Sequence, residues 1–270
     1  MPLNRPLAFW MQLGFTLAVC AFLIVPVGLS ILAGLTENIF TGVASGLTTQ
    51  WLVKVWTDYR HTVFLSIQVA LACLVATLVL GVPVAYVLAR RQNSFTRAIE
   101  ELLVMPVAVP GLATALALIV TYGGLGDFRR SWFFILVGHV LFTLPFMVRS
   151  VLAVLTTIDL ATLEEGARSL GASFVQRFVG IVLPNCRGGI LAGSLMVVTL
   201  SLGEFNMTLL LHTPLTPTLP VGLADAYASL RLEVGSAYTL VFFVIVIPLL
   251  VAMQWAATPR RPTKPPKEPR

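Results

Sequence analysis

Long apolar stretches dominate this sequence and restrict what the chain can fold into. An α-helix needs about 20 mostly apolar residues to cross the hydrocarbon core of a bilayer, and six stretches reach that length. They run from Phe9 to Leu35, Thr62 to Ala89, Leu102 to Tyr122, Trp132 to Leu155, Gly188 to Leu211 and Ser236 to Trp255. Backbone groups in lipid must be hydrogen-bonded within their own segment. The sequence therefore predicts an all-α polytopic bundle with six transmembrane helices.

Composition argues against a soluble protein. Only 11% of the residues are charged and 57% are hydrophobic, whereas soluble domains carry about 25% charged residues. The net charge of +6 does not indicate nucleic acid as a partner, because the basic residues are spread over short loops and a tail. The cysteines are isolated and form neither a disulfide framework nor a metal motif: Cys20, Cys73 and Cys186. We expect a lipid environment and no metal.

The distribution of basic residues predicts the topology. With the N-terminus in the cytoplasm, thirteen of the 18 Lys and Arg residues fall on the cytoplasmic side and five outside. The positive-inside rule therefore places both termini in the cytoplasm. The first stretch is too long for a signal peptide core and is interpreted as an uncleaved span. We expect a cytoplasmic N-terminus at 1–8, a transmembrane domain at 9–257 and a disordered, Pro-rich cytoplasmic tail at 258–270.

The predicted cytoplasmic loop between the fourth and fifth stretches, residues 157–187, is long and patterned, and long connections usually serve a function. Asp159 is the predicted N-cap of a short helix. The apolar residues of this helix recur with helical spacing and form one stripe: Leu160, Leu163, Ala167 and Leu170. The charged residues are predicted to point away from that stripe: Glu164, Glu165 and Arg168.

A corner and a second helix are predicted after this first helix. Gly171 occupies the position where a left-handed residue ends a helix, and Ser173 with Gln176 fits a capping box. Pro184 is expected to end the second helix. The first helix could instead lie in the lipid headgroups, but such helices usually carry Lys and Arg. Two Glu and one Arg fit a protein partner better.

The segment EGARSLGASFVQRFVGIVLP resembles the EAA signature of binding-protein-dependent ABC importer permeases. That signature reads E-A-A, three residues, G, nine residues, I-x-L-P, and identifies Glu165 rather than Glu164 as its glutamate. The residues at the signature positions are Glu165, Gly166, Ala167, Gly171, Ile181, Leu183 and Pro184. Gly166 replaces the usual Ala, which costs about 1 kcal/mol of helix propensity but keeps the register.

The resemblance extends from about Thr62 to Leu250. The segment SLGEFNMTLLL, Ser201 to Leu211, and the P-x-x-x-P of the third stretch are similar to the branch serving polyamines, aminoethylphosphonate, sulfate or molybdate, ferric iron and thiamine. A polyamine or aminoethylphosphonate-like substrate is expected. Within this family selectivity rests largely with the external binding protein, so the sequence leaves the substrate open.

The resemblance also implies a mechanism and partners. The first loop helix would be a coupling helix that docks into a cytoplasmic ATPase. Two ATPases, a second permease (the same or a related chain) and an external substrate-binding protein would complete the importer. Its location would be a bacterial inner membrane. Glu165 and Arg168 would be the exposed contacts. The implied coupling set is Glu164, Glu165, Gly166, Ala167, Arg168, Gly171, Ile181, Leu183 and Pro184. ATP would bind the partner, since the chain has no GxxxxGK[ST] loop. We therefore expect neither an enzyme nor a bound cofactor.

Four polar residues stand out within the apolar stretches: Gln68, His139, Glu204 and Asn206. Three of them, Gln68, His139 and Glu204, lie about seven residues from the predicted outer end of their helices, roughly 10 Å below the outer face. One interpretation is a polar layer near the outer gate or translocation path, with His139 paired to Glu204. The other is a set of interhelical hydrogen bonds that hold the bundle together.

Two outer loops, Thr36 to Arg60 and His212 to Gly235, are the expected docking face for the binding protein. The second loop includes a short helix near Leu223 to Leu230, and its Asp225 and Arg231 are either contacts or solvated charges. A secondary transporter, a channel and an intramembrane enzyme are the alternatives. No internal repeat, nucleophile–base set or metal-ligand motif supports them.

Overall fold

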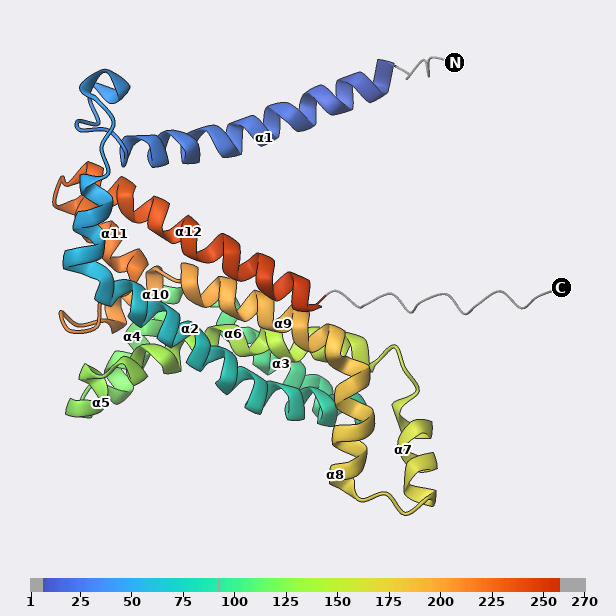
Figure 1. The fold of residues 1–270 in the computed structure, drawn as a ribbon. Helices are drawn as coiled ribbons and strands as arrows, with labels where there is room; N and C mark the ends of the chain where they lie inside the picture. Colours follow the sequence, from blue (N-terminus) through green and yellow to red (C-terminus); the bar gives the residue numbers. More distant parts are fainter. Residues whose placement is uncertain (1–6, 92, 258–270) are drawn as a thin grey trace. The chain divides into compact units, whose positions relative to one another are not determined.

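The computed structural model describes residues 7–91 and 93–257, and these residues form a series of helices (Figure 1). The predicted tail at 258–270 lies outside the described residues, as do residues 1–6 of the predicted N-terminal segment. The α-helices are α1 Leu7–Ala33, α2 Gln50–Arg90, α3 Ser94–Ala108, α4 Gly111–Tyr122, α5 Gly126–Arg130, α6 Trp132–Leu155, α7 Leu160–Ser169, α8 Phe174–Arg177, α9 Leu183–Gly203, α10 Asn206–Leu211, α11 Leu219–Ala228 and α12 Leu232–Ala257. A 3₁₀ turn, η1, spans Gly42–Ser45, and a π-helical segment, η2, spans Phe178–Val182.

The described helices include five that are long and apolar enough to cross a membrane. These are α1, α2, α6, α12 and the continuous run Phe174–Gly203, which contains α8, η2 and α9. A sixth candidate is the pair of α3 and α4, which are bent by 101° with respect to each other. The predicted all-α architecture is confirmed, and six spans result when the bent pair counts as one.

The third predicted span is not the single helix expected from Leu102 to Tyr122. Helix α3 ends at Ala108, and Val109 is extended, with φ −85° and ψ 132°. The residue before a proline is driven out of the α conformation by a clash with the proline ring, and Pro110 is the N-cap of α4. Pro106, in contrast, is accommodated inside α3.

Two other spans also differ from their expected boundaries. Helix α2 begins at Gln50 rather than Thr62, because hydropathy identifies the lipid-crossing part of a helix and not its polar extension. The fifth span, expected from Gly188 to Leu211, is interrupted: α9 ends at Gly203, and α10 starts at Asn206.

The chain divides into two units, Met1–Val63 with Leu219–Ile245, and Phe64–Thr218 with Val246–Arg270. In the first unit, the short helix expected near Leu223 to Leu230 is α11, which starts earlier than expected, at Leu219. The two loop charges there bind each other, with Arg231 Nη2 2.9 Å from Asp225 Oδ2. Arg231 also donates a hydrogen bond to the Tyr59 hydroxyl.

In the second unit, α6 packs closely along α9. The approach depends on Gly189 and Gly193, which form a G-x-x-x-G pattern on α9. A Cβ atom at Gly189 would overlap the Ser150 carbonyl oxygen, and one at Gly193 would lie 2.8 Å from Met147 Sδ. Small residues at this spacing let two membrane helices approach until their backbones touch. This contact brings the fourth and fifth spans together at the base of the 157–187 loop.

Candidate functional site

Helix α7, the first helix of the 157–187 loop, begins with the predicted cap. The Asp159 carboxylate accepts hydrogen bonds from the Thr162 amide at 3.2 Å and from the Thr162 hydroxyl at 2.7 Å. The hydroxyl bond and the amide bond both favour the ionised form, so they lower the pKa of Asp159. Two local hydrogen bonds therefore determine where α7 starts.

The end of α7 also has the predicted geometry. Gly171 adopts a φ of +82°, which is unfavourable for residues with a Cβ atom. Its amide donates to the Arg168 carbonyl at 2.9 Å, and the Ala172 amide donates to the Ala167 carbonyl at 3.0 Å. This pair of bonds is the Schellman motif. The predicted capping box of Ser173 and Gln176 follows directly.

Pro184 does not end the second helix, contrary to expectation. Helix α8 passes through the π-helical segment η2 into α9 without a break, and Figure 1 shows α8 continuing into α9. The Leu183 amide donates to the Phe178 carbonyl, five residues back. A wider turn of this kind accommodates a proline, which has no amide hydrogen to donate. The corner at Gly171 is thus joined rigidly to the fifth span.

Glu164 is the residue of α7 that the structure places most differently from expectation. The sequence predicts a side chain that points away from the apolar stripe, but Glu164 is only 2% exposed. The Tyr86 hydroxyl donates to Glu164 Oε1 at 2.8 Å. Arg90 Nε lies 3.4 Å from Oε2, and Arg177 Nη1 lies 3.8 Å from Oε1. We call Tyr86, Arg90, Glu164 and Arg177 the Glu164 cluster.

The Glu164 cluster joins the two loop helices to α2, which is distant from them in sequence. Tyr86 and Arg90 come from the last turns of α2, Glu164 from α7 and Arg177 from α8. Tyr86 accepts a hydrogen bond from Arg90 at 3.0 Å while donating to Glu164. A buried carboxylate is stable only when it is paired and hydrogen-bonded. The sequence reasoning missed the three partners, although Tyr86 and Arg90, one helical turn apart at the end of an apolar stretch, were an available signal.

The apolar stripe predicted for α7 is therefore divided between two faces. Leu160 is buried beside Glu164, which lies one turn later on the same face. Leu163 is 44% exposed and Leu170 is 90% exposed. The prediction of a single stripe is therefore wrong for these two leucines, which do not share the buried face of Leu160. The inward face of α7 is held mainly by ion pairs, and the outward face carries leucines.

The remaining residues of the predicted coupling set take several positions. Glu165, Gly166 and Arg168 are exposed on α7, and Ala167 is half-buried. Ile181 and Leu183 are half-buried in η2 and at the start of α9, and Pro184 is exposed. The Glu165 and Arg168 side chains are therefore accessible for an external contact, as expected from the sequence.

The predicted pairing of His139 with Glu204 is wrong. His139 is buried, and its two ring nitrogens lie 2.8 Å from Ser201 Oγ and 2.8 Å from Thr208 Oγ1. Its carbonyl accepts a hydrogen bond from Thr143 at 2.7 Å. The two hydroxyl groups satisfy the imidazole fully, so no carboxylate is needed. His139 thus links α6 to α9 and α10, which matches the alternative of interhelical hydrogen bonds.

Glu204 instead lies in the break between α9 and α10. Its Oε1 accepts a hydrogen bond from the Met207 amide at 2.7 Å, so the carboxylate caps the first turn of α10. A Cβ atom at Gly111 would lie 3.4 Å from the same oxygen. The break after α9 therefore adjoins the break between α3 and α4. Asn206 and Gln68 are exposed, and neither belongs to the His139 contacts.

Comparison with known proteins agrees with this architecture. The family model described as binding-protein-dependent transport system inner membrane component matches residues 81–258. The sulfate transport system permease protein CysW of Synechocystis sp. is 27% identical over 208 residues, 72% of this chain and 75% of CysW. The spermidine/putrescine transport system permease protein PotB of Escherichia coli is 28% identical over 219 residues, 74% of this chain and 78% of PotB.

A solved structure shows the same fold. The bacterial ABC transporter involved in the import of the acidic polysaccharide alginate contains a chain that superimposes with a TM-score of 0.67 at 17% identity. The match covers 93% of this chain and 94% of the other. The chain therefore belongs to the family of inner membrane components of binding-protein-dependent transport systems and is a permease of the ABC importer type.

Proposed function

We propose that this permease moves a small solute across the membrane and that α7 is the helix through which a cytoplasmic ATPase drives it. The observation that carries the proposal is the construction of α7. Its inner face is held to α2 and α8 by the Glu164 cluster. Leu163 and the C-cap Leu170 are exposed on one side of the helix, and Glu165 and Arg168 are exposed on another. Exposed leucines that the protein's own core does not cover are typical of a protein-binding surface.

The way α7 is attached supports its use as a lever. The cap at Asp159 and the Schellman motif at Gly171 leave little freedom at either end of the helix. The continuous run from α8 to α9 carries a displacement of the corner directly into the fifth span. The cluster also links α7 to the end of α2. A force on the outer face of α7 would therefore reach two spans.

The partners follow from this mechanism. We infer two ATPase subunits, which bind ATP, and a second permease bundle, either a copy of this chain or a related one. An external binding protein would deliver the solute to the outer loops. The excess of Lys and Arg on the α7 side supports a cytoplasmic position for this loop and for both termini. A bacterial inner membrane is the location that fits such an assembly.

The two helix breaks are the proposed location of the translocation path. Discontinuous helices place polar backbone groups within the membrane, and such groups are tolerated where they line a cavity. Glu204 holds the start of α10 in place, and Asn206 leaves its amide accessible. We keep Glu204, Asn206 and Gln68 as candidates for the path and assign His139 a structural role.

A small charged solute of the polyamine or aminoethylphosphonate type is the proposed substrate. The similarity to PotB supports this class, whereas the similarity to CysW makes sulfate the competing candidate. The SLGEFNMTLLL segment fits both, because the branch it resembles includes both kinds of substrate. Cells that express the complete importer should take up spermidine or 2-aminoethylphosphonate and not sulfate. Uptake of sulfate alone would contradict the proposed class.

The coupling proposal is tested by changing the outer face of α7. We expect Leu163→Ser with Leu170→Ser to reduce both ATPase co-purification and ATP-dependent uptake at least tenfold. Both leucines are exposed, so abundance and thermal stability should stay at the level of the unchanged protein. The matched control is Leu125→Ser, which changes a leucine that is 56% exposed between α4 and α5, outside the two expected docking loops. Full co-purification and uptake by the double variant would refute α7 as the ATPase contact.

A further inference from the structure

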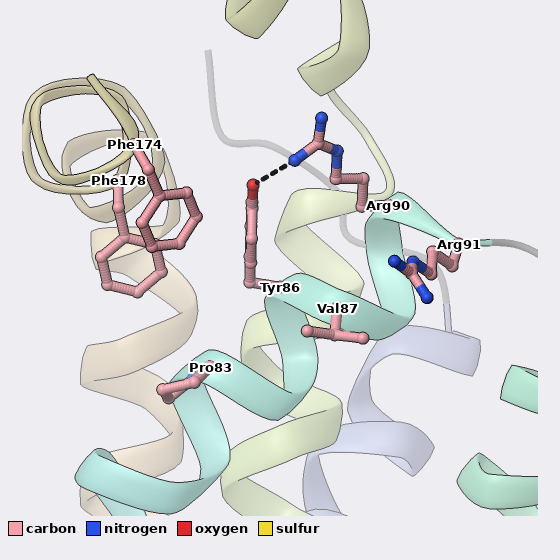
Figure 2. A pocket seen from close by; sticks show the side chains of 7 residues that line it. All are labelled: Pro83, Tyr86, Val87, Arg90, Arg91, Phe174 and Phe178. Atoms are coloured by element: carbon pink, nitrogen blue, oxygen red, sulfur yellow. Dashed lines mark hydrogen bonds between the residues drawn. The ribbon is translucent and has the colours of Figure 1, made fainter.

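The last turns of α2 form a ridge between two apolar grooves in the second unit. The first groove, shown in Figure 2, has a volume of about 520 Å³. Pro83, Tyr86 and Val87 form its α2 wall, and Phe174 and Phe178 form the opposite wall. The two phenylalanine rings are stacked with centroids 6.0 Å apart. The groove is therefore walled mainly by carbon atoms.

The second groove lies on the α3 side of the same ridge. Its volume is about 340 Å³, and Phe95 and Ile99 contribute its far wall. Pro83, Val87 and Arg91 line both grooves. The grooves therefore run along two sides of one helix end and share Arg91, which lies just after the final residue of α2.

Positive charge is concentrated where the grooves meet. Arg90 and Arg177 together face the single carboxylate of Glu164, so that cluster keeps a positive charge. Arg91 is exposed and has no ion pair among the residues that the structure describes. Figure 2 shows Arg90 bound to Tyr86, and the side chain of the next residue, Arg91, directed away from this pair. The combined site offers two uncompensated positive charges next to apolar walls.

We propose that these grooves bind one anionic phospholipid, with an acyl chain on each side of the α2 ridge and the phosphate at Arg91. A soluble anion would pair with the arginines but would leave the apolar walls without a contact. A polar peptide would leave its backbone groups without partners along them. A diacyl lipid matches both features, because basic pockets at the ends of membrane helices bind anionic headgroups. The proposal rests on the membrane location of the chain and is independent of ATPase coupling.

The lipid would stabilise the junction on which α7 depends. Tyr86 belongs to the Glu164 cluster and also lines the first groove. Phe174 and Phe178 belong to the continuous run from α8 to α9. An acyl chain between these residues would fill the space beside the cluster and exclude water from its ion pairs, which strengthens them.

Native mass spectrometry of the full chain, purified with its associated subunits and titrated with phosphatidylglycerol or phosphatidylcholine, tests the proposal. We expect one phosphatidylglycerol to bind at least fivefold more tightly than phosphatidylcholine. Arg91→Gln should remove this preference, and Val87→Trp should block binding of both lipids by filling the grooves. Arg149→Gln is the matched control, since it removes another exposed arginine from a span, and should leave binding unchanged.

Three results would overturn the proposal. The first is equal affinity of the unchanged protein for the two lipids. The second is an equal loss of phosphatidylglycerol affinity in Arg91→Gln and Arg149→Gln. The third is crosslinking of Val87→Cys to an associated subunit in place of lipid. The Leu163→Ser, Leu170→Ser variant should bind phosphatidylglycerol normally. Its behaviour separates a failure of lipid binding from a failure of ATPase coupling.

Discussion

A glutamate that belongs to no apolar stripe holds the proposed coupling helix in place. Removing a carboxylate from water costs several kcal/mol, and close opposite charges offset that cost only with good geometry. Glu164 has one hydroxyl donor and two guanidinium partners. Its neighbour Glu165 has the same charge but is exposed. Comparing substitutions at the two positions therefore distinguishes the effect of a buried carboxylate from that of a surface carboxylate.

Glu164→Ala should destabilise the protein, and Glu165→Ala should not. The first change leaves Arg177 without its carboxylate, at a cost of roughly 1 to 3 kcal/mol. The cost stays below that of a fully buried pair because Arg90 is 44% exposed. Thermal unfolding in detergent measures the difference. Equal melting temperatures for the two variants would show that the cluster contributes no stability.

Gly189→Ala should disrupt the packing of α6 against α9. The new methyl group would overlap the Ser150 carbonyl oxygen, a backbone atom that cannot rotate away. Overpacking of this kind costs about 1 to 3 kcal/mol. The adjacent Gly188→Ala is the matched control, because its methyl group would have no neighbour within 4 Å. The unfolding temperature and the expression level should fall only for Gly189→Ala, because Ala is otherwise a better helix former than Gly. A parallel loss in Gly188→Ala would show that the overlap with Ser150 is not the cause.

At the scale of helices, interruptions have specific causes. Pro110 forces Val109 out of the helix and produces the bend between α3 and α4. Pro184 does not break the helix, because the π-helical segment before it already lacks the usual hydrogen-bond spacing. A proline therefore interrupts one span, whereas in another span the helix continues through a proline.

The break at Glu204 leads to a prediction about capping. Glu204→Gln keeps an oxygen that accepts from the Met207 amide, whereas Glu204→Ala removes it. We expect uptake within about twofold of normal for Glu204→Gln and a clear reduction for Glu204→Ala, since a hydrogen bond of this kind contributes about 1 kcal/mol. Uptake normalised to protein abundance is the measurement. A large loss in Glu204→Gln at normal abundance would assign the negative charge itself to the path.

For the whole molecule, orientation in the membrane decides which partner each loop can reach. Apolar length does not distinguish the two sides of a bilayer, so the inferred topology rests on Lys and Arg alone. With the proposed orientation, the α7 loop would be accessible to a cytoplasmic ATPase and the loops beside α11 to an external binding protein. The reverse orientation would leave α7 without an energy source.

Cysteine labelling tests this orientation in intact cells. Ser169→Cys in α7 and Ser229→Cys after α11 both introduce exposed thiols. The parent protein for both variants needs only the substitution Cys20→Ser, because Cys73 and Cys186 are buried. A membrane-impermeant maleimide should label Ser229→Cys at once and Ser169→Cys only after permeabilisation. The opposite pattern would reverse the inferred topology.

The local features of this protein were predictable from short segments. The caps at Asp159 and Ser173 and the left-handed Gly171 depend on residues within four positions of one another. The membrane spans depend on stretches of apolar composition. The sequence alone thus determined the helical membrane architecture, the position of α7 and its family signature, because each of these arises from local backbone chemistry or from the length of apolar chain needed to cross lipid.

The tertiary structure decided which face of α7 is buried and what each polar group binds. Glu164 finds Tyr86 on another helix, and His139 finds Ser201 and Thr208 rather than Glu204. Spacing along one helix shows which residues share a face but not which face a distant arginine or hydroxyl will meet. The free energy of a buried polar group depends on that partner. Only the packed arrangement of helices could therefore assign these roles.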